Sequence, residues 1–469
     1  MRNDTSRNTF RPNRHYSRVL MQQGRVLLDA DWNEQAAIFH HYLQTLARDL
    51  IGPYGGPAKD WGFKILNNND ADAQHLPEIN LNFWIGPGRY YVDGLLCEND
   101  GFCLYAPPVT PPGNSQADFI PEKLVDGKYL VYLDVWERHV TALEDEAIRE
   151  VALGPQGPDT TTRVKVVWQV KTFKLEGTSF DNFQCNNSIE QTGVSIHEGW
   201  ADLLKELQPA NRGLLRAKAD EPDDINASNP CIISPDARYR GAENQLYRVE
   251  IHQGQPGTAT FKWSRENGSV ALPIRSISGN KVTLEHMGRD ERFGLQVGDW
   301  VEIEGTNYEN VDRLEAPALL EVEEVNYVDM FVILSGPSDT SDSGRVLRRW
   351  DQKAGDLHIG GSELRNGAVL IKEGTPQREN WLTLEDGVQI QFQQGAAPNT
   401  YRRGDYWLIP ARTATGDVEW PGPLNAPEAI PPHGVQHHYA PLARITLALN
   451  NVTEVVADLR RRFTFFAQC

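Results

Sequence analysis

The chain has 469 residues, 40% of them hydrophobic and 23% charged, so it has enough apolar material for roughly two to four folded domains. Its formal net charge of −18, from 46 basic and 64 acidic residues, excludes broad electrostatic binding to nucleic acid or anionic lipid. The 39 Gly and 29 Pro residues indicate many turns. The many Trp and Tyr residues and the scarce Met favour β-strands over long helices.

The cysteines are typical of a reducing compartment. They are Cys97, Cys103, Cys185, Cys231 and Cys469, an odd number with no CxxC pair, so we predict neither a disulfide framework nor a zinc site of common spacing. No apolar run reaches the roughly 18 residues that span a bilayer, and no secretory signal opens the chain. We expect assembly in the cytoplasm and no direct membrane insertion, so release or action at the cell envelope would need another route.

The first eighteen residues, MRNDTSRNTFRPNRHYSR, form a basic arm. They carry five arginines and a single acidic residue, although the chain as a whole is acidic. This pattern predicts either docking on an acidic partner surface or an arm that is simply solvated. The candidate contact residues of the arm are Arg2, Arg7, Arg11, Arg14 and Tyr16.

A β-hairpin is predicted between the arm and the first helix. Two short apolar runs, Val19–Met21 and Val26–Leu28, flank a Gln-Gln-Gly turn, which is typical of paired strands. A lone hairpin is marginal in water, so we expect it to be held by the helix that follows.

The strongest predicted element is that helix, whose start lies in GRVLLDADWNEQ. Asp31 is expected to be the N-cap with Glu34 completing a capping box, and Gly52-Pro53 is expected to end the helix. One apolar stripe recurs at three- and four-residue spacing: Ala36, Phe39, Leu43, Leu46, Ala47 and Leu50. We expect this stripe to be buried against another module or subunit, so that the arm, hairpin and helix form a compact hook braced by Trp32 and its polar neighbours.

The remainder of the chain predicts a mainly β, multi-domain protein with few helices. Short strands such as YLVYLDVWERHV, RVKVVWQVKT and the pair QLYRVEIHQG and TATFKWSREN are punctuated by turns. A short helix is expected at GWADLLKELQP. We predict several small sandwich- or barrel-like modules with boundaries at 1–58 (arm, hairpin and helix), 59–175, 176–240 (connector or insertion), 241–345 and 346–469.

The acidic residues of GRVLLDADWNEQ admit three interpretations, namely a metal site, a catalytic pair or architecture. Asp29, Asp31 and Asn33 match the first three ligands of an EF-hand loop, but Glu34 occupies the required glycine and His40 the required glutamate. Asp29 and Asp31 would also point to opposite sides of an extended segment, which is poor geometry for paired acid–base chemistry. Helix capping explains Asp31 and Glu34, and we expect Asp29 to pair with an arm arginine.

Other motifs carry little chemistry. His433, His437 and His438 lack a nearby Cys or carboxylate and are expected to form a solvated or hydrogen-bonded loop cluster rather than a metal site. There is no phosphate-binding loop and no GxSxG nucleophile motif. Tryptophans could stack on sugars, but most lie inside apolar strand runs and are expected to pack in cores: Trp136, Trp168, Trp263, Trp300 and Trp407. No metal, cofactor or catalytic residue is predicted.

Several long phrases nevertheless resemble one family. FRPNRHYSRVLMQQGRVLLDADWNEQ, YLVYLDVWERHVTALEDEAIREVALG, QLYRVEIHQGQPGTATFKWSRENGSV and YRRGDYWLIPARTATGDVEWP resemble an uncharacterised bacterial family encoded beside phage-tail-like extracellular contractile injection systems. The N-terminus is also similar to the entry segment of some phage baseplate proteins. The resemblance implies a structural part of the injection particle near its baseplate or spike, and it transfers no catalytic residue.

We therefore expect a non-enzymatic subunit that acts by protein–protein assembly with other particle subunits and is oligomeric within the particle. The expected assembly residues are the four arm arginines and Tyr16 together with Asp29, Asp31, Trp32, Asn33 and Glu34. Two alternatives remain open, a glycan- or cell-surface-binding module on such a particle and a carbohydrate-active enzyme.

Overall fold

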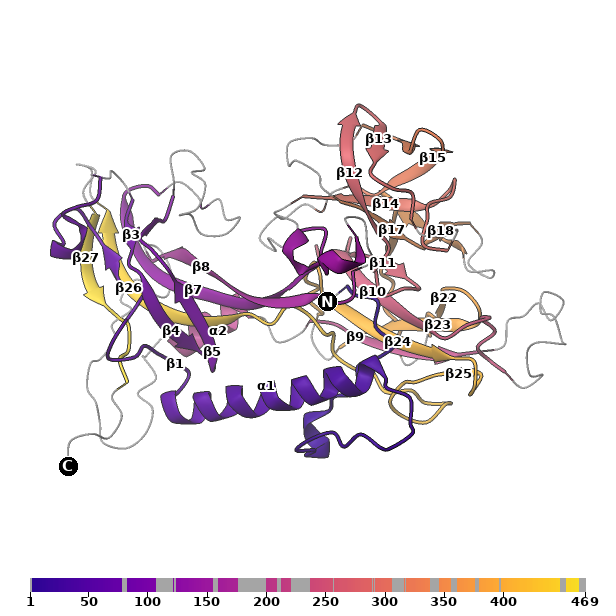
Figure 1. Cartoon of the computed structure of the whole chain (residues 1–469), viewed down its shortest axis with the longest axis horizontal. Coiled ribbons are helices and arrows are strands. Elements are labelled where there is room, and N and C mark those ends of the chain that lie inside the picture. The colour runs from indigo at the N-terminus through magenta and orange to yellow at the C-terminus, as the bar shows by residue number, and fades with distance from the viewer. Residues whose placement is uncertain are drawn as a thin grey trace.

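A computed structural model describes most of the chain. The described residues are 2–77, 82–106, 121, 124–154, 159–175, 200–208, 212–220, 237–255, 257–288, 290, 292–305, 316, 318–337, 346–355, 361–375, 379–395, 398–447 and 453–463. Strands dominate these residues, as the sequence predicts. Figure 1 shows two β-rich lobes side by side, a barrel above the second lobe, and one long helix along their lower side.

The first lobe combines the beginning and the end of the chain. Its four-stranded sheet has the order β27-β26-β7-β8 and is antiparallel throughout. Its strands are β7 (Gly127–Val140), β8 (Arg163–Lys174), β26 (His438–Leu447) and β27 (Thr453–Asp458). Six shorter strands form two three-stranded sheets beside it: β1 (Tyr54–Gly55), β4 (Gly88–Val92) and β5 (Leu95–Asn99), then β2 (Ile65–Leu66), β3 (Trp84–Ile85) and β6 (Cys103–Leu104). The predicted short helix is α2 (Trp200–Leu207), and it buries Trp200 and Leu203 in the core of this lobe.

The second lobe is built on the predicted hairpin of β10 (Gln245–Gln253) and β11 (Thr260–Ser264). Its six-stranded sheet continues on both sides with β20 (Leu364–Arg365), β21 (Ala368–Leu370), β24 (Tyr406–Arg412) and β25 (Asp417–Val418). A three-stranded sheet of β9 (Leu214–Ala219), β22 (Leu382–Thr383) and β23 (Val388–Gln393) accompanies it. Their shared core contains the fully buried Trp263, Tyr247 and Trp407.

A closed six-stranded barrel follows the β10–β11 hairpin in the chain. Its strands are β12 (Ala271–Ser278), β13 (Lys281–Leu284), β14 (Trp300–Glu304), β15 (Leu320–Asn326), β16 (Phe331–Leu334) and β17 (Val346–Trp350). Closure pairs every barrel strand on both sides and so removes the exposed edges that promote aggregation. A two-residue parallel pair, β18 (Lys353–Ala354) and β19 (Gly361–Ser362), lies after it in sequence.

Strand pairing crosses the boundaries predicted from sequence. β26, near the end of the chain, pairs with β7 of the first lobe, and β23 pairs with β9 across the whole barrel sequence. The C-terminal third of the chain therefore contributes strands to both lobes. Pairing between strands that are far apart in the chain cannot be predicted from local sequence patterns. The five-part division of the chain stays a sequence-based prediction.

Helix α1 (Asp29–Ile51) joins the two lobes along their lower side (Figure 1). It buries Ala30, Ile38 and Ile51. Its C-terminal half approaches the first lobe, where the side-chain amide of Gln44 donates to the Asp93 carbonyl at 3.2 Å. Gly94 has a φ of +82°, and a Cβ there would lie 2.2 Å from the Gln44 carbonyl oxygen, so glycine is required for this close approach.

Two predictions about the start of α1 are wrong. Residues 15–28 form no strand, although the predicted turn exists, with Arg25 N–H donating to the Gln22 carbonyl. The helix begins at Asp29, its N-cap is Leu28, and Asp31 therefore lies within the first turn and caps nothing with its side chain. The predicted end at Gly52 is confirmed, since its N–H donates to the Arg48 carbonyl at 2.8 Å. Four isolated single turns of 3-10 helix complete the regular structure of the described residues: Pro12–Arg14, Ala71–Ala73, Glu146–Ile148 and Val151–Leu153.

Candidate functional site

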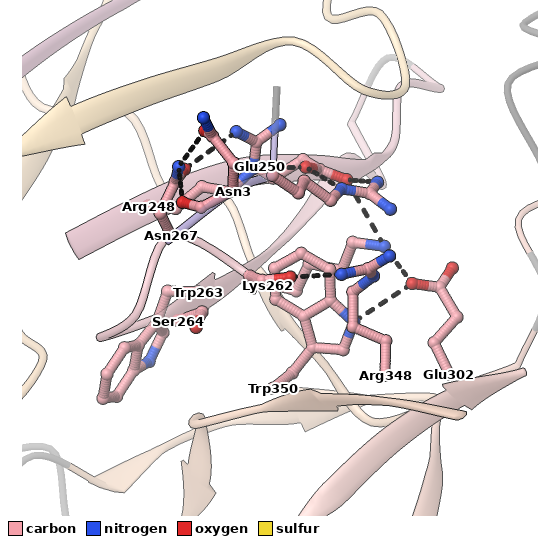
Figure 2. Close-up of polar contacts among 12 residues, drawn as sticks. Asn3, Arg248, Glu250, Lys262, Trp263, Ser264, Asn267, Glu302, Arg348 and Trp350 are labelled. Carbon is pink, nitrogen blue, oxygen red and sulfur yellow. Dashed lines mark hydrogen bonds and ion pairs between the residues drawn. The ribbon is translucent and has the colours of Figure 1, made fainter. Parts of the chain in front are cut away.

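The N-terminal arm is fastened to the second lobe by Arg2. Its guanidinium donates to Glu250 through Nε at 3.1 Å and to Glu304 through Nη1 at 2.6 Å. The Arg2 side chain is 13% exposed and that of Glu250 is 1% exposed, so this contact is nearly dry. Arg2 also lies over the ring of Trp350, with 5.5 Å from its Cζ to the ring centroid. Figure 2 shows the residues that surround this contact.

Arg2 enters a group of six charged residues and one tryptophan between the six-stranded sheet and the barrel, which we call the cradle. It consists of Arg248 and Glu250 on β10, Lys262 on β11, Glu302 and Glu304 on β14, and Arg348 and Trp350 on β17 (Figure 2 labels all but Glu304). On each strand the paired members are two residues apart, so they point to the same face. Strand register sets Glu250 opposite Lys262 and Glu302 opposite Arg348.

Each charge of the cradle is matched by an opposite one. Lys262 binds Glu302 closely, and its Nζ lies 3.5 Å from Glu250 and 4.2 Å from the centroid of the Trp350 ring. Arg348 donates to Glu304 through Nε at 2.7 Å and Nη2 at 2.9 Å. Buried charges persist only where such pairing compensates for lost hydration.

The cradle keeps the carboxylates of Glu250 and Glu302 ionised. Burial opposes the ionisation of Glu250, yet Arg2, Arg248 and Lys262 together hold its pKa well below the usual range. Burial likewise opposes ionisation of Glu302, and Lys262 overcomes it and lowers the pKa of that carboxyl. Burial lowers the pKa of Lys262 itself, while Glu302 and Glu250 act in the opposite direction. Arg2 thus completes a network in which both acids stay negative.

The arm then follows the second lobe to the start of α1. The Asn267 side chain donates to the Asn3 carbonyl at 2.9 Å, and Arg412 donates to the Ser6 carbonyl at 2.8 Å. Arg7 pairs with Glu419 at 3.1 Å, both roughly 40% exposed. The acidic groups that Arg2 and Arg7 contact therefore belong to the same chain.

Asp29 and Glu34 bind the arm and do not take the roles predicted for them. Asp29 accepts from the Ser6 N–H at 2.9 Å and from its hydroxyl at 2.7 Å, so the expected partner, an arm arginine, is wrong. Burial works against the ionised form of Asp29, but the Ser6 bonds prevail and lower its pKa. Glu34 accepts from the Thr9 hydroxyl at 2.6 Å, which replaces the predicted capping box. Both acids close residues 6–29 into a loop.

The other predicted arm residues lie at the surface. Arg11, Arg14 and Tyr16 are exposed, Asn33 is exposed on the first turn of α1, and Asp31 is partly exposed beside it. Acidic residues in a first helical turn interact favourably with the helix dipole, and that accounts for Asp31.

The outer face of α1 carries large apolar side chains that contact water. We call this set the α1 stripe, and it consists of Trp32, Ala36, Phe39, Leu43, Leu46 and Leu50. All six residues are exposed, with Trp32 at 79% and Leu43 at 67%. Of the stripe predicted from sequence, Ala47 is partly buried and the other five residues are exposed, so no module in the described part of this chain covers it. The buried residues of α1 are Ala30, Ile38 and Ile51, on another face, and burial of the stripe against another subunit stays a prediction.

The loop that leads into α1 extends the exposed apolar surface. Its large side chains are also more exposed than buried in most cases: Tyr16, Leu20, Met21, Val26, Leu27 and Leu28. Scattered apolar residues are ordinary on protein surfaces, but a contiguous patch of several hundred Å² marks an interaction site. Of the tryptophans in the described residues, Trp32 alone is exposed. The five that were expected in cores are buried or partly buried.

A separate cavity of about 500 Å³ lies beside the cradle. Its lining includes Arg265, Asp299, Arg349 and Asp351, and its arginines are engaged with neighbouring groups. Arg265 binds Glu385 at 2.6 Å, and Arg349 lies 3.3 Å from Asp351 and donates to two carbonyls. Arg265 and Arg349 are therefore already paired with groups in and around the cavity.

Histidines near the C-terminus are held singly by acids. His437 Nδ1 lies 2.6 Å from Asp134, and His438 Nδ1 lies 2.9 Å from Asp93. The two adjacent histidines therefore bind different parts of the first lobe. Across the described residues no group of three His, Cys, Asp or Glu side chains could hold a metal ion. A search of the same residues finds no helix long and apolar enough to cross a membrane.

Sequence reasoning singled out Arg2 but missed its acceptors. A signal was present, since charged residues alternate with apolar ones in the strands YRVEIH and WVEIEG, and others interrupt the apolar strands FKWS and LRRW. Alternation inside strands that are buried on both faces indicates charges that must be paired within the protein. The strands that supply the paired charges can be identified only when the six-stranded sheet and the barrel are placed against each other.

Comparison with known proteins gives a family without a function. The family described as "Family of unknown function (DUF6519)" matches residues 1–192 and 207–449, which is most of the chain. No curated protein matches the chain, and no solved structure does.

Proposed function

We propose that this chain, which belongs to the DUF6519 family of unknown function, is a structural subunit of a phage-tail-like contractile injection particle. In this proposal it is assembled in the cytoplasm, acts without catalysis, and contacts other subunits near the baseplate or spike. The resemblance of its long sequence phrases to a family encoded beside such systems supports the choice of particle.

The exposed α1 stripe is the observation that carries the proposal. Large side chains that fold onto the solvent side of a rigid helix gain nothing within the chain, and they gain free energy when another protein covers them. Five of them are each more than half exposed. At about 150–250 Å² for a large side chain, they present on the order of 550 Å², and the preceding loop raises this to about 1,000 Å². A standard interface buries about 800 Å² on each partner.

The arm contributes by fixing this surface in place. Arg2 in the cradle, Arg7 at Glu419 and the Ser6–Asp29 bonds tie the loop and the start of α1 to the second lobe. A preorganised surface loses less conformational entropy on binding than a flexible one. The basic arm therefore acts inside the chain, and the α1 stripe with its loop meets the neighbour.

The test is incorporation into particles purified from the native host. Leu43→Asp places a charge in the centre of the stripe and is expected to prevent co-sedimentation of the chain with sheathed tubes. Val328→Asp is the matched control, because Val328 is 90% exposed but lies on the barrel side, away from α1. Equal incorporation of wild type and both variants, or absence of the wild-type chain from the particles, would refute the proposal.

A further inference from the structure

The α1 stripe repeats with alternating spacings of four and three residues from Trp32 to Leu50. This is the spacing of the core positions of a coiled coil, in which each side chain packs between side chains of a second helix. The stripe occupies nearly the full length of α1, a helix of 23 residues or about 35 Å. A second helix is therefore the shape that fits this surface.

The order of side-chain sizes along the stripe is complementary to its own reverse. In an antiparallel pair of α1 helices centred on His41, Trp32 faces Leu50, Ala36 faces Leu46, and Phe39 faces Leu43. Large residues then meet smaller ones in every layer, which fills the seam evenly. A parallel pair would instead set two Trp32 rings together and two Ala36 methyl groups together, with crowding in one layer and a void in the next.

The residues that flank the stripe permit the same pairing. They are Asn33, His40 and Ala47 on one side and Gln35, Tyr42 and Asp49 on the other. In the antiparallel register each flank faces the same flank of the second copy. Asn33 then lies near Ala47, Gln35 near Asp49, His40 near the second His40 and Tyr42 near the second Tyr42, so no two fixed like charges face each other. Flanking positions of coiled coils usually select a different partner through complementary charges, and here Asp49 is the one residue with a fixed charge.

We infer that the occupant of the α1 stripe is a second copy of this chain, bound through antiparallel α1 helices about a twofold axis. A twofold axis makes the two surfaces identical and closes the assembly as a dimer. The buried residues of α1, Ala30, Ile38 and Ile51, lie on the face opposite the stripe. At its flanks, His40 Nε2 lies 3.5 Å from Glu137 of β7, and Gln35 accepts from the Val19 N–H at 2.7 Å. In Figure 1 both lobes lie above α1, and among the described residues the arm and loop lie below its N-terminal part. The exposed apolar area estimated above is enough for a stable dimer.

This inference rests on the proposed assembly role but is tested on the purified full-length chain, without particles. Sedimentation velocity over a wide concentration range should show a dimer for the wild type. Leu43→Asp should weaken dimerisation at least about tenfold, while its circular dichroism and melting temperature stay close to wild type. A wild-type chain that stays monomeric at high micromolar concentration, or a Leu43→Asp dimer of wild-type affinity, would overturn the inference.

A charge-pair experiment tests the orientation and does not depend on one variant. Ala36→Glu alone and Leu46→Lys alone should each weaken the dimer. The double variant should recover at least part of the lost affinity, because in the antiparallel register the glutamate introduced on one copy would face the lysine introduced on the other. A double variant weaker than both single variants would indicate facing like charges, as in a parallel pair, and would refute the antiparallel dimer. Absence of the wild-type chain from purified particles, together with an intact wild-type dimer in solution, would count against the proposed function alone.

Discussion

The two ends of the N-terminal segment contrast in how completely their side chains are matched. Arg2 enters a buried cradle in which each charge meets an opposite charge, with Arg2 itself bound to Glu250 and Glu304. About thirty residues later, the α1 stripe carries five large apolar side chains that are each more than half exposed. A buried charge without a partner and an apolar surface in water each cost free energy. Folding of the chain pairs the buried charges but leaves the apolar surface exposed. The difference separates an anchor from a contact surface.

The cradle should show the largest effects on stability. Lys262→Met leaves Glu302, which is fully buried, without its closest cation. We expect a loss of about 3–5 kcal/mol in the free energy of unfolding, because one partner of a buried pair is left uncompensated. Urea unfolding monitored by fluorescence measures it. The double variant Lys262→Met with Glu302→Gln should recover part of the loss, and an equal or greater loss would contradict the pairing argument.

Removal of Arg2 should have a smaller effect on the same network. Arg2→Ala deprives Glu250 of one cation but leaves Arg248 and Lys262 in place, so we expect a loss of about 2 kcal/mol. Limited proteolysis of the arm should also become faster, since its deepest anchor is gone. Arg7→Ala is the control, because an exposed ion pair contributes at most about 1 kcal/mol. Equal losses of unfolding free energy in Arg2→Ala and Arg7→Ala would contradict the claim that Arg2 anchors the arm more strongly than the exposed Arg7.

The contribution of the cradle should depend on pH in a defined direction. The pKa of Glu250 is lowered in the folded chain, so its ionised form stabilises folding above the ordinary value of 4.5, and this stability is lost as the pH falls below 4.5. The difference in unfolding free energy between wild type and Arg2→Ala should thus be constant near neutral pH and shrink in acid. A difference that grows below pH 4.5 would contradict an ionised Glu250 as the partner of Arg2.

Changes in the α1 stripe should have the smallest effect on stability. Leu43→Asp and Phe39→Ser alter exposed side chains, so we expect changes within about 0.5 kcal/mol in the isolated chain under conditions where it is monomeric. Ile38→Ala, one residue from Phe39 but 1% exposed, is the matched control and should cost about 2–4 kcal/mol. Thermal unfolding in dilute solution compares them. A large loss from Leu43→Asp would mean that the stripe is packed within the chain.

Local patterns predicted the elements well where one periodicity dominates. The presence of α1, its end at Gly52, the helix at Trp200–Leu207 and the β10–β11 hairpin all follow from spacing and turn residues. The start of α1 was misplaced because Asp31 fits the N-cap rules, whereas the arm returns to bind Asp29 through Ser6. A tertiary contact thus displaced a local preference.

The candidate site depended more strongly on long-range structure. The sequence identified the apolar stripe and the basic arm, yet it could not show which face of α1 meets the lobes. It also could not show that Glu250 and Glu304, from separate sheets, converge on Arg2. Both facts arise when β10 and β14 are brought together from distant parts of the chain, and an amphipathic pattern alone does not distinguish an intramolecular partner from another subunit.

The most direct test of the central claim is site-specific photocrosslinking in the assembled state. A photoreactive amino acid at position 43 lies in the middle of the α1 stripe, and one at position 48 lies on the same helix outside it. The account predicts an interchain adduct from position 43, of twice the mass of the chain if α1 pairs with itself, and little adduct from position 48. Absence of any adduct from position 43, or equal yields from both positions, would contradict the claim that the stripe is an interface.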